Sequence, residues 1–166
     1  MNGGLLMSAW YDIKGNPQKI MSLKENKKGL LNSVDQIEKI IQEETNLGIQ
    51  SQKIMLVGHS QGASLALTVG LTSEYHLAGI IGLSAFLPCR NEIFNWAKAE
   101  NKINSFFLYH NRYDNVIPSN IGSKSAQILK EKGYRVEFED KHNGNHFFRL
   151  DELQEILIER INQLIS

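Results

Sequence analysis

The sequence has little of several features that mark particular classes of protein. Cys89 is the single cysteine, so an internal disulfide is excluded, and a reducing, cytoplasmic location is the simple expectation. Basic and acidic residues each number 18, so no excess of positive charge favours nucleic acid or an anionic membrane surface. No apolar run reaches the length of a membrane span, and the N-terminus lacks the regions of a secretory signal. We expect no nucleic-acid partner and no stable membrane insertion.

The 166 residues, 42% of them apolar, fit one domain over 1–166. Residues 1–25 show little periodicity and predict a loop. Apolar runs predict buried strands at 54–57, 78–83 and 106–109, and alternation predicts a half-exposed strand near a sheet edge at 134–139. We expect helices at 26–47, 61–73, 91–100, 119–132 and 151–165, the last with Leu153, Leu157, Ile161 and Leu164 on one face. Alternating elements with apolar strands predict an α/β fold, a mainly parallel sheet with helices on both faces.

A G-x-S-x-G sequence at 58–62 joins a predicted strand to a predicted helix, the context of a nucleophile elbow. Gly58 and Gly62 let strand and helix approach closely, and Ser60 is held clear of the backbone. The N–H of Gln61 and the helix N-terminus then face the anion that forms when Ser60 attacks a carbonyl. A chance match and a phosphate-binding turn are the alternatives, but the glycine and lysine patterns of nucleotide sites are absent.

Two further loops follow predicted strands, and the carboxyl ends of parallel strands are where sites form. Asp114 is the one carboxylate in the loop 110–118; on loop position alone it is equally well a turn aspartate. The loop 140–148 offers His142 and His146. α/β-hydrolases take their partners in the order serine, acid, histidine, which Ser60, Asp114 and His146 obey. His142 remains an alternative to His146, whereas His59 and His76 precede the acid and do not fit.

Taken together, these residues resemble the acyl-protein thioesterases and bacterial carboxylesterases of the phospholipase/carboxylesterase family. The matching stretches are W-Y-D-I at 10–13, G-H-S-Q-G at 58–62, G-L-S with L-P at 82–88, the acid loop at 110–118 and G-N-H at 144–146. The resemblance implies an α/β-hydrolase fold and a serine hydrolase that cleaves carboxylic esters or acyl thioesters, including lysophospholipids. It also implies that Asp114 is the catalytic acid and His146 the catalytic histidine.

The sequence departs from the family pattern in two places. Asn111 stands where the family has glycine, and the family's H-G-x-G-D loop, which supplies a second oxyanion N–H, has no counterpart before Trp10. We therefore expect the N-terminal strands of the fold to be missing. The strand 54–57 would then form an apolar edge that invites aggregation or pairing with another chain, a homodimer included.

The leading hypothesis is an enzyme with Ser60, His146 and Asp114 as catalytic residues and Gln61 as oxyanion donor, acting on a small or lipid-like acyl substrate. We expect no cofactor and no metal, because the histidine, aspartate and cysteine residues lack ligand spacing. The alternative is a truncated, catalytically impaired remnant that binds a partner or has no function.

Overall fold

Parallel strands form the central sheet of the protein, whose computed structural model describes residues 8–15 and 23–165. The strand order is β3–β4–β5–β6, with bounds Met55–His59, Gly79–Leu83, Ser105–Asn111 and Arg135–His142. All neighbouring pairs are parallel, so the carboxyl ends of the strands lie along one edge. The predicted α/β class is confirmed, and the predicted strand positions agree with the structure to within a few residues.

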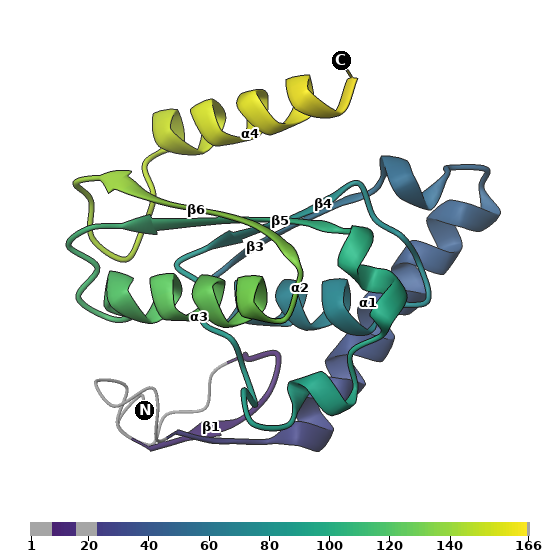
Figure 1. Ribbon diagram of the computed structural model, residues 1–166, viewed down its shortest axis with the longest axis horizontal. Helices are drawn as coiled ribbons and strands as arrows, with labels where there is room; N and C mark the ends of the chain where they lie inside the picture. The colour runs from purple at the N-terminus through teal and green to yellow at the C-terminus, as the bar shows by residue number, and fades with distance from the viewer. Residues whose placement is uncertain (1–7, 16–22, 166) are drawn as a thin grey trace.

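Helices cover both faces of this sheet, as the sequence predicts (Figure 1). α2 (Gln61–Thr72) and α3 (Ser119–Glu131) lie on one face, α1 (Lys27–Asn46) packs on α2, and α4 (Leu150–Ile165) lies on the other face. Every residue of α2 from 63 to 71 is buried, because the helix is enclosed by the sheet and α1. The core therefore centres on α2 and the fully buried strand β4.

The helix expected at 91–100 is not formed. Two 3₁₀ segments, Ile93–Asn95 and Ala99–Ile103, occupy the connection between β4 and β5 instead. The reason is tertiary: Lys98 N–H donates to the Leu71 carbonyl, and the buried amide of Asn101 donates to the Ser73 carbonyl. These groups satisfy the C-terminal end of α2 rather than an α-helical ladder of their own.

The predicted buried face of the last helix is also wrong in part. In α4 the line of buried residues is Glu152, Ile156 and Arg160, whereas Ile161 is 49% exposed. Leu153 and Leu157 pack only partly against the core, and the side chain of Leu164 lies outside the described part of the chain. The helix thus packs with the face that carries Arg160 toward the sheet. Apolar periodicity in the sequence does not predict this face, because arginine is not apolar.

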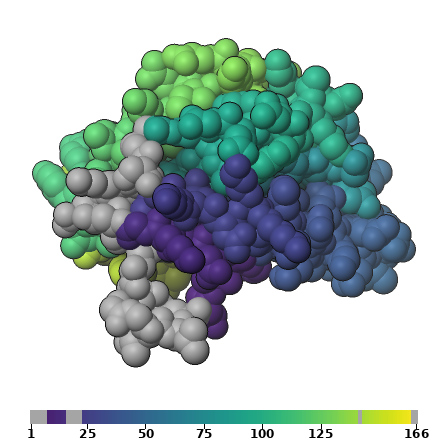
Figure 2. Space-filling view, turned by 90° about the horizontal axis from the view of Figure 1, so that it is seen from below, coloured from purple at the N-terminus to yellow at the C-terminus, as the bar shows by residue number. Residues whose placement is uncertain are grey.

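The first residues are not wholly loop. Among those described, β1 (Ile13–Lys14) and β2 (Lys24–Glu25) form a short antiparallel pair, and the rest of the predicted loop at 1–7 and 16–22 lies outside the described residues. The N–H of Asn26 donates to the Asp12 carbonyl and continues this pairing. Figure 2 shows this purple-to-blue part of the chain against the teal segment after β4, where Cys89 N–H donates to the Glu25 carboxylate.

β3 lies at an edge of the sheet and pairs only with β4 among the described residues. Val57, in the middle of this strand, is 49% exposed. The expected apolar edge at 54–57 is thus present, next to the site that the sequence predicts at the end of the same strand.

Candidate active site

Ser60 occupies a strained turn between β3 and α2. Its backbone angles, φ 54° and ψ −119°, lie in a region that residues other than glycine rarely adopt. Ser60 N–H donates to the Leu83 carbonyl at 2.8 Å, which continues the pairing of β3 with β4 as far as the serine. A Cβ atom at Gly58 would lie 2.3 Å from the Gly62 carbonyl oxygen, so the close approach of strand and helix requires this glycine. The sequence G-H-S-Q-G therefore produces the geometry of a nucleophile elbow.

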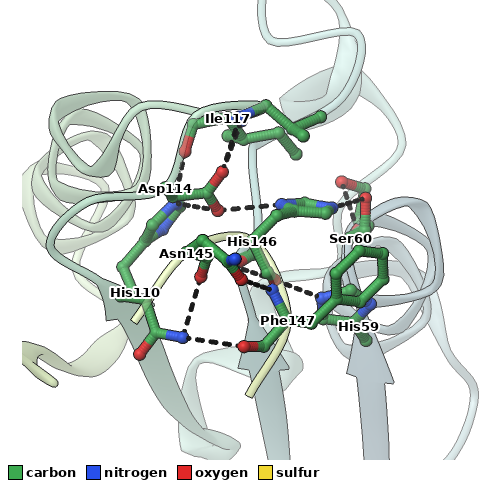
Figure 3. A network of polar contacts seen from close by, with 12 residues as sticks. His59, Ser60, His110, Asp114, Ile117, Asn145, His146 and Phe147 are labelled. Atoms are coloured by element: carbon green, nitrogen blue, oxygen red, sulfur yellow. Dashed lines mark hydrogen bonds and ion pairs between the residues drawn. The ribbon is translucent and has the colours of Figure 1, made fainter. Parts of the chain in front are cut away.

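The structure brings the three predicted catalytic residues together at the carboxyl ends of the strands (Figure 3). His146 Nε2 lies 3.0 Å from Ser60 Oγ, and His146 Nδ1 lies 2.8 Å from Asp114 Oδ2. His146 and Asp114 are buried, 6% and 7% exposed, so water does not compete strongly for these contacts. The result is a continuous hydrogen-bonded chain from the serine hydroxyl to a carboxylate.

Asp114 is held as an anion by the groups around it. Its Oδ1 accepts the N–H groups of Val116 at 2.9 Å and Ile117 at 2.8 Å. Its Oδ2 faces His146 and, at 3.3 Å, Nε2 of the buried His110, which also lies 2.7 Å from the Ile117 carbonyl oxygen. Burial opposes ionisation, but the hydrogen bonds from His110, His146 and the two backbone groups outweigh it and hold the pKa of Asp114 well below its usual value.

An ionised Asp114 fixes the proton of His146. A carboxylate accepts only, so His146 Nδ1 must carry a hydrogen and donate it to Asp114 Oδ2. In the neutral ring Nε2 then has a free lone pair, which accepts the hydroxyl hydrogen of Ser60. This tautomer is the one that can remove the serine proton.

Gln61 contributes both its backbone and its side chain. Its N–H belongs to the first turn of α2, where amide groups have no acceptor within the helix. Its side-chain amide accepts from Trp10 N–H at 2.9 Å and donates to the Tyr11 carbonyl at 2.7 Å. The second role was not predicted: Gln61 holds the W-Y-D-I segment beside the serine. A hollow of about 270 Å³ lies there, lined by Trp10, Val57 and His59 among others.

Sequence analysis missed the residues that hold the loop of His146. The chain order excludes His59 as the base, but its Nε2 lies 2.8 Å from the His146 carbonyl oxygen. Asn111, noted only as a departure from the family pattern, donates to the carbonyls of Asn145 at 2.9 Å and Phe147 at 3.3 Å. A Cβ at Gly144 would lie 2.6 Å from the Asn111 amide nitrogen, so Asn111 and Gly144 fit one another.

The other candidate histidines are His142 and His76, and the structure describes the first of them only in its backbone. The backbone of His142 belongs to β6 and pairs with Asn111, and its side chain lies outside the described part of the structure. His76 is exposed in the connection between α2 and β4. Within residues 8–15 and 23–165, no cluster of histidine, cysteine and acidic groups could hold a metal ion. No helix of the described chain is long and apolar enough to cross a membrane.

Comparison with known proteins gives a consistent set of relatives. Acyl-protein thioesterase 1 of Yarrowia lipolytica is 31% identical over 159 residues, which cover 95% of this chain and 69% of the relative. The Neurospora crassa protein of the same name is 34% identical, covering 96% of this chain and 68% of its own. Acyl-protein thioesterase 1 of Emericella nidulans is 34% identical, and the match covers 80% of this chain and 58% of that relative. The chain is therefore markedly shorter than these relatives and spans less than two thirds of the third.

Solved structures agree on the fold. SOBER1 of Arabidopsis thaliana superposes with a TM-score of 0.90 at 26% identity, covering 99% of this chain and 78% of SOBER1. Acyl-protein thioesterase 2 of Zea mays superposes with a TM-score of 0.76 at 22% identity over 94% of this chain and 72% of its own, a likeness of fold alone. The family model of the phospholipases and carboxylesterases matches residues 1–164. The predicted family is confirmed: this chain belongs to the phospholipase/carboxylesterase family of α/β-hydrolases.

Proposed function

We propose that this protein is a serine hydrolase that cleaves carboxylic esters or acyl thioesters, with Ser60 as nucleophile, His146 as general base and Asp114 as the acid that orients it. The observation that carries the proposal is the unbroken chain of contacts, 3.0 Å from Ser60 Oγ to His146 Nε2 and 2.8 Å from His146 Nδ1 to Asp114 Oδ2. The relatives named acyl-protein thioesterase support acyl thioesters as one substrate class.

The proposed reaction begins when Ser60 Oγ attacks the acyl carbonyl carbon and its proton passes to His146 Nε2. Asp114 stabilises the resulting imidazolium, and the Gln61 N–H at the start of α2 donates to the oxyanion. Collapse of the tetrahedral intermediate transfers the His146 proton to the departing alcohol or thiol and leaves an acyl ester on Ser60. Water, deprotonated by His146, attacks this ester and releases the carboxylic acid, with the proton returned to Ser60.

The alternative of a remnant without catalytic function is not favoured. A chain that had lost its reaction would have no need to retain a strained serine turn together with a buried carboxylate at the far end of the same hydrogen-bonded chain. The glycine required at position 58 is retained as well.

The test is hydrolysis of a short-chain aryl ester and of an acyl thioester by the wild type and by Ser60→Ala. We expect Ser60→Ala to abolish turnover of both and to prevent covalent labelling by a fluorophosphonate probe. Ser123→Ala, at an exposed position on α3, is the matched control and should behave as the wild type. Near-normal turnover by Ser60→Ala would refute the proposal.

A further inference from the structure

We infer that His59 is a positioning residue of this hydrolase: its imidazole donates a hydrogen bond to the backbone of His146 and holds the base in line with Ser60. The inference rests on the proposed function, because it assigns His59 a task only if His146 acts on Ser60. It concerns a residue that lies outside the chain of contacts from Ser60 to Asp114.

The contacts of His59 with the histidine loop are direct (Figure 3). Its Nε2 lies 2.8 Å from the carbonyl oxygen of His146, and a carbonyl only accepts, so Nε2 carries the hydrogen. Its ring also packs on the ring of His146, with centroids 4.8 Å apart and planes tilted by 51°. The ring of Phe147 also packs on His59, with the two ring centroids 5.5 Å apart. The His59 side chain thus contacts both the backbone and the ring of His146.

Residues 143–149, the histidine loop, need such contacts because they form neither helix nor strand. Asn111, at the end of β5, holds the carbonyls of Asn145 and Phe147, which flank His146. His59, at the end of β3, holds the carbonyl between them. Within the described part of the chain, Ser84 Oγ also donates to that carbonyl, at the longer distance of 3.4 Å. The backbone at His146 is therefore fixed from two strands, with His59 as the short contact on the nucleophile's side.

The charge of His59 suits this task. Burial lowers the pKa of His59 below its usual value. The hydrogen bond to the His146 carbonyl raises this pKa, and the positive charge that His146 acquires lowers it. Asp114 raises the pKa of His59 and His110 lowers it, both by less than the groups just named. A neutral His59 with hydrogen on Nε2 can donate to the backbone without repelling the imidazolium that forms at His146.

His59 stands directly before Ser60, so it connects the nucleophile's own strand to the base. A displacement of the base by about 1 Å can cost on the order of 10²-fold in rate, because proton transfer needs aligned donor and acceptor. The hydrogen bond from His59 acts against such a displacement. Ring packing alone does not fix the distance along the bond, whereas the donor to the carbonyl does.

Two substitutions separate the hydrogen bond from the packing. His59→Phe keeps a ring against His146 and Phe147 but removes the donor. His59→Gln loses the ring but can present an amide N–H at the position of Nε2. His76→Phe and His76→Gln, at an exposed histidine remote from the site, are the matched controls.

The measurements are kcat and KM for an aryl ester, normalised to sites titrated to completion with a fluorophosphonate, together with a thermal melt. We expect His59→Phe to lower kcat by about tenfold or more with little change in KM, and His59→Gln to stay within about threefold of the wild type. The His76 controls should match the wild type in kcat. A role in folding alone would instead lower the melting temperature and the titratable fraction without changing kcat per site.

Either of two results would overturn the inference: wild-type kcat per site in His59→Phe, or equal losses in His59→Phe and His59→Gln. These outcomes are distinct from failure of the proposed function, which is read from Ser60→Ala. If Ser60→Ala is inactive and His59→Phe is fully active, the function stands and the positioning role does not.

Discussion

Asp114→Asn exchanges one carboxylate oxygen for an NH₂ group at a site where one oxygen accepts from two backbone N–H groups and the other faces His146. Asp114 Oδ1 accepts the N–H groups of Val116 and Ile117 at 2.9 and 2.8 Å. In the variant the single amide oxygen has to take this place, because an NH₂ group facing two N–H donors would leave all of them unpaired in a buried position. The amide nitrogen then replaces Oδ2, which faces His146.

This placement reverses the hydrogen bond to the base. The new NH₂ group donates to His146 Nδ1 across the 2.8 Å that now separates it from the carboxylate. A neutral His146 can accept it only with Nδ1 bare and the proton on Nε2. That proton points at Ser60 Oγ, 3.0 Å away, so the ring can no longer accept the serine hydrogen. The variant retains every atom needed for packing and loses the base.

We therefore expect Asp114→Asn to lower kcat by about 10⁴-fold, the loss that the same exchange causes in a serine protease triad. This corresponds to about 5 kcal/mol of transition-state stabilisation. The assay is aryl-ester turnover at neutral pH, with Asp35→Asn at an exposed position of α1 as the matched control. A melting curve shows whether the variant is folded. If a folded Asp114→Asn retained kcat within about tenfold of the wild type, the tautomer argument would be refuted.

The same substitution has a predictable effect on stability. Burial raises the pKa of Asp114, but hydrogen bonds from His110, His146 and the backbone lower it further, and the net pKa in the folded state lies below the unfolded value of about 3.9. Ionised Asp114 thus stabilises the folded state above that unfolded value, and the contribution is lost as the pH falls toward the folded pKa. In urea titrations, the difference in unfolding free energy between wild type and Asp114→Asn should be constant at neutral pH and shrink below about pH 4. A difference that grew in acid would contradict this sign.

Two further predictions concern the histidine loop and α4. His146→Ala should abolish aryl-ester turnover while His142→Ala leaves most of it, since His146 Nε2 lies 3.0 Å from Ser60 Oγ; comparable losses would reverse the assignment. Arg160→Ala should lower the unfolding free energy by about 2–4 kcal/mol, measured in urea, because the side chain is buried and its guanidinium lies over the ring of Phe107 and donates to the Tyr109 hydroxyl. The exposed Arg149→Ala should change it by less than about 0.5 kcal/mol, and equal effects would show that burial of Arg160 contributes nothing.

The parts of the fold that could be predicted are those decided by local composition. β4 reads as an unbroken apolar run because it is buried on both faces, and it was expected at 78–83 and found at Gly79–Leu83. The connection at 93–103 could not be predicted, since its polar groups are satisfied by the end of α2 rather than by neighbours in sequence. The face of α4 was misjudged because Arg160 is buried by partners from other strands, Glu137 and Glu139 of β6 and Tyr109 of β5.

The candidate site was predicted to a similar depth. Motif spacing and chain order placed Ser60, Asp114 and His146 at strand ends, and the structure brings these side chains together; their catalytic roles stay predictions. The roles of His59 and Asn111 could not be derived, because each depends on a backbone carbonyl in a loop remote in sequence. One signal was available: Asn111 departs from the family's glycine.

The positions of these two residues suggest why the geometry of the site does not depend on the histidine loop alone. Ser60 and His59 are consecutive residues at the end of β3, and Asp114 follows β5, which ends at Asn111. Each strand thus supplies one residue in line with the reaction and one donor that holds the backbone of the His146 loop. A shift of either strand would move its two residues together. The alignment of nucleophile, base and acid is therefore set by the register of β3 and β5 on either side of β4, every residue of which is buried.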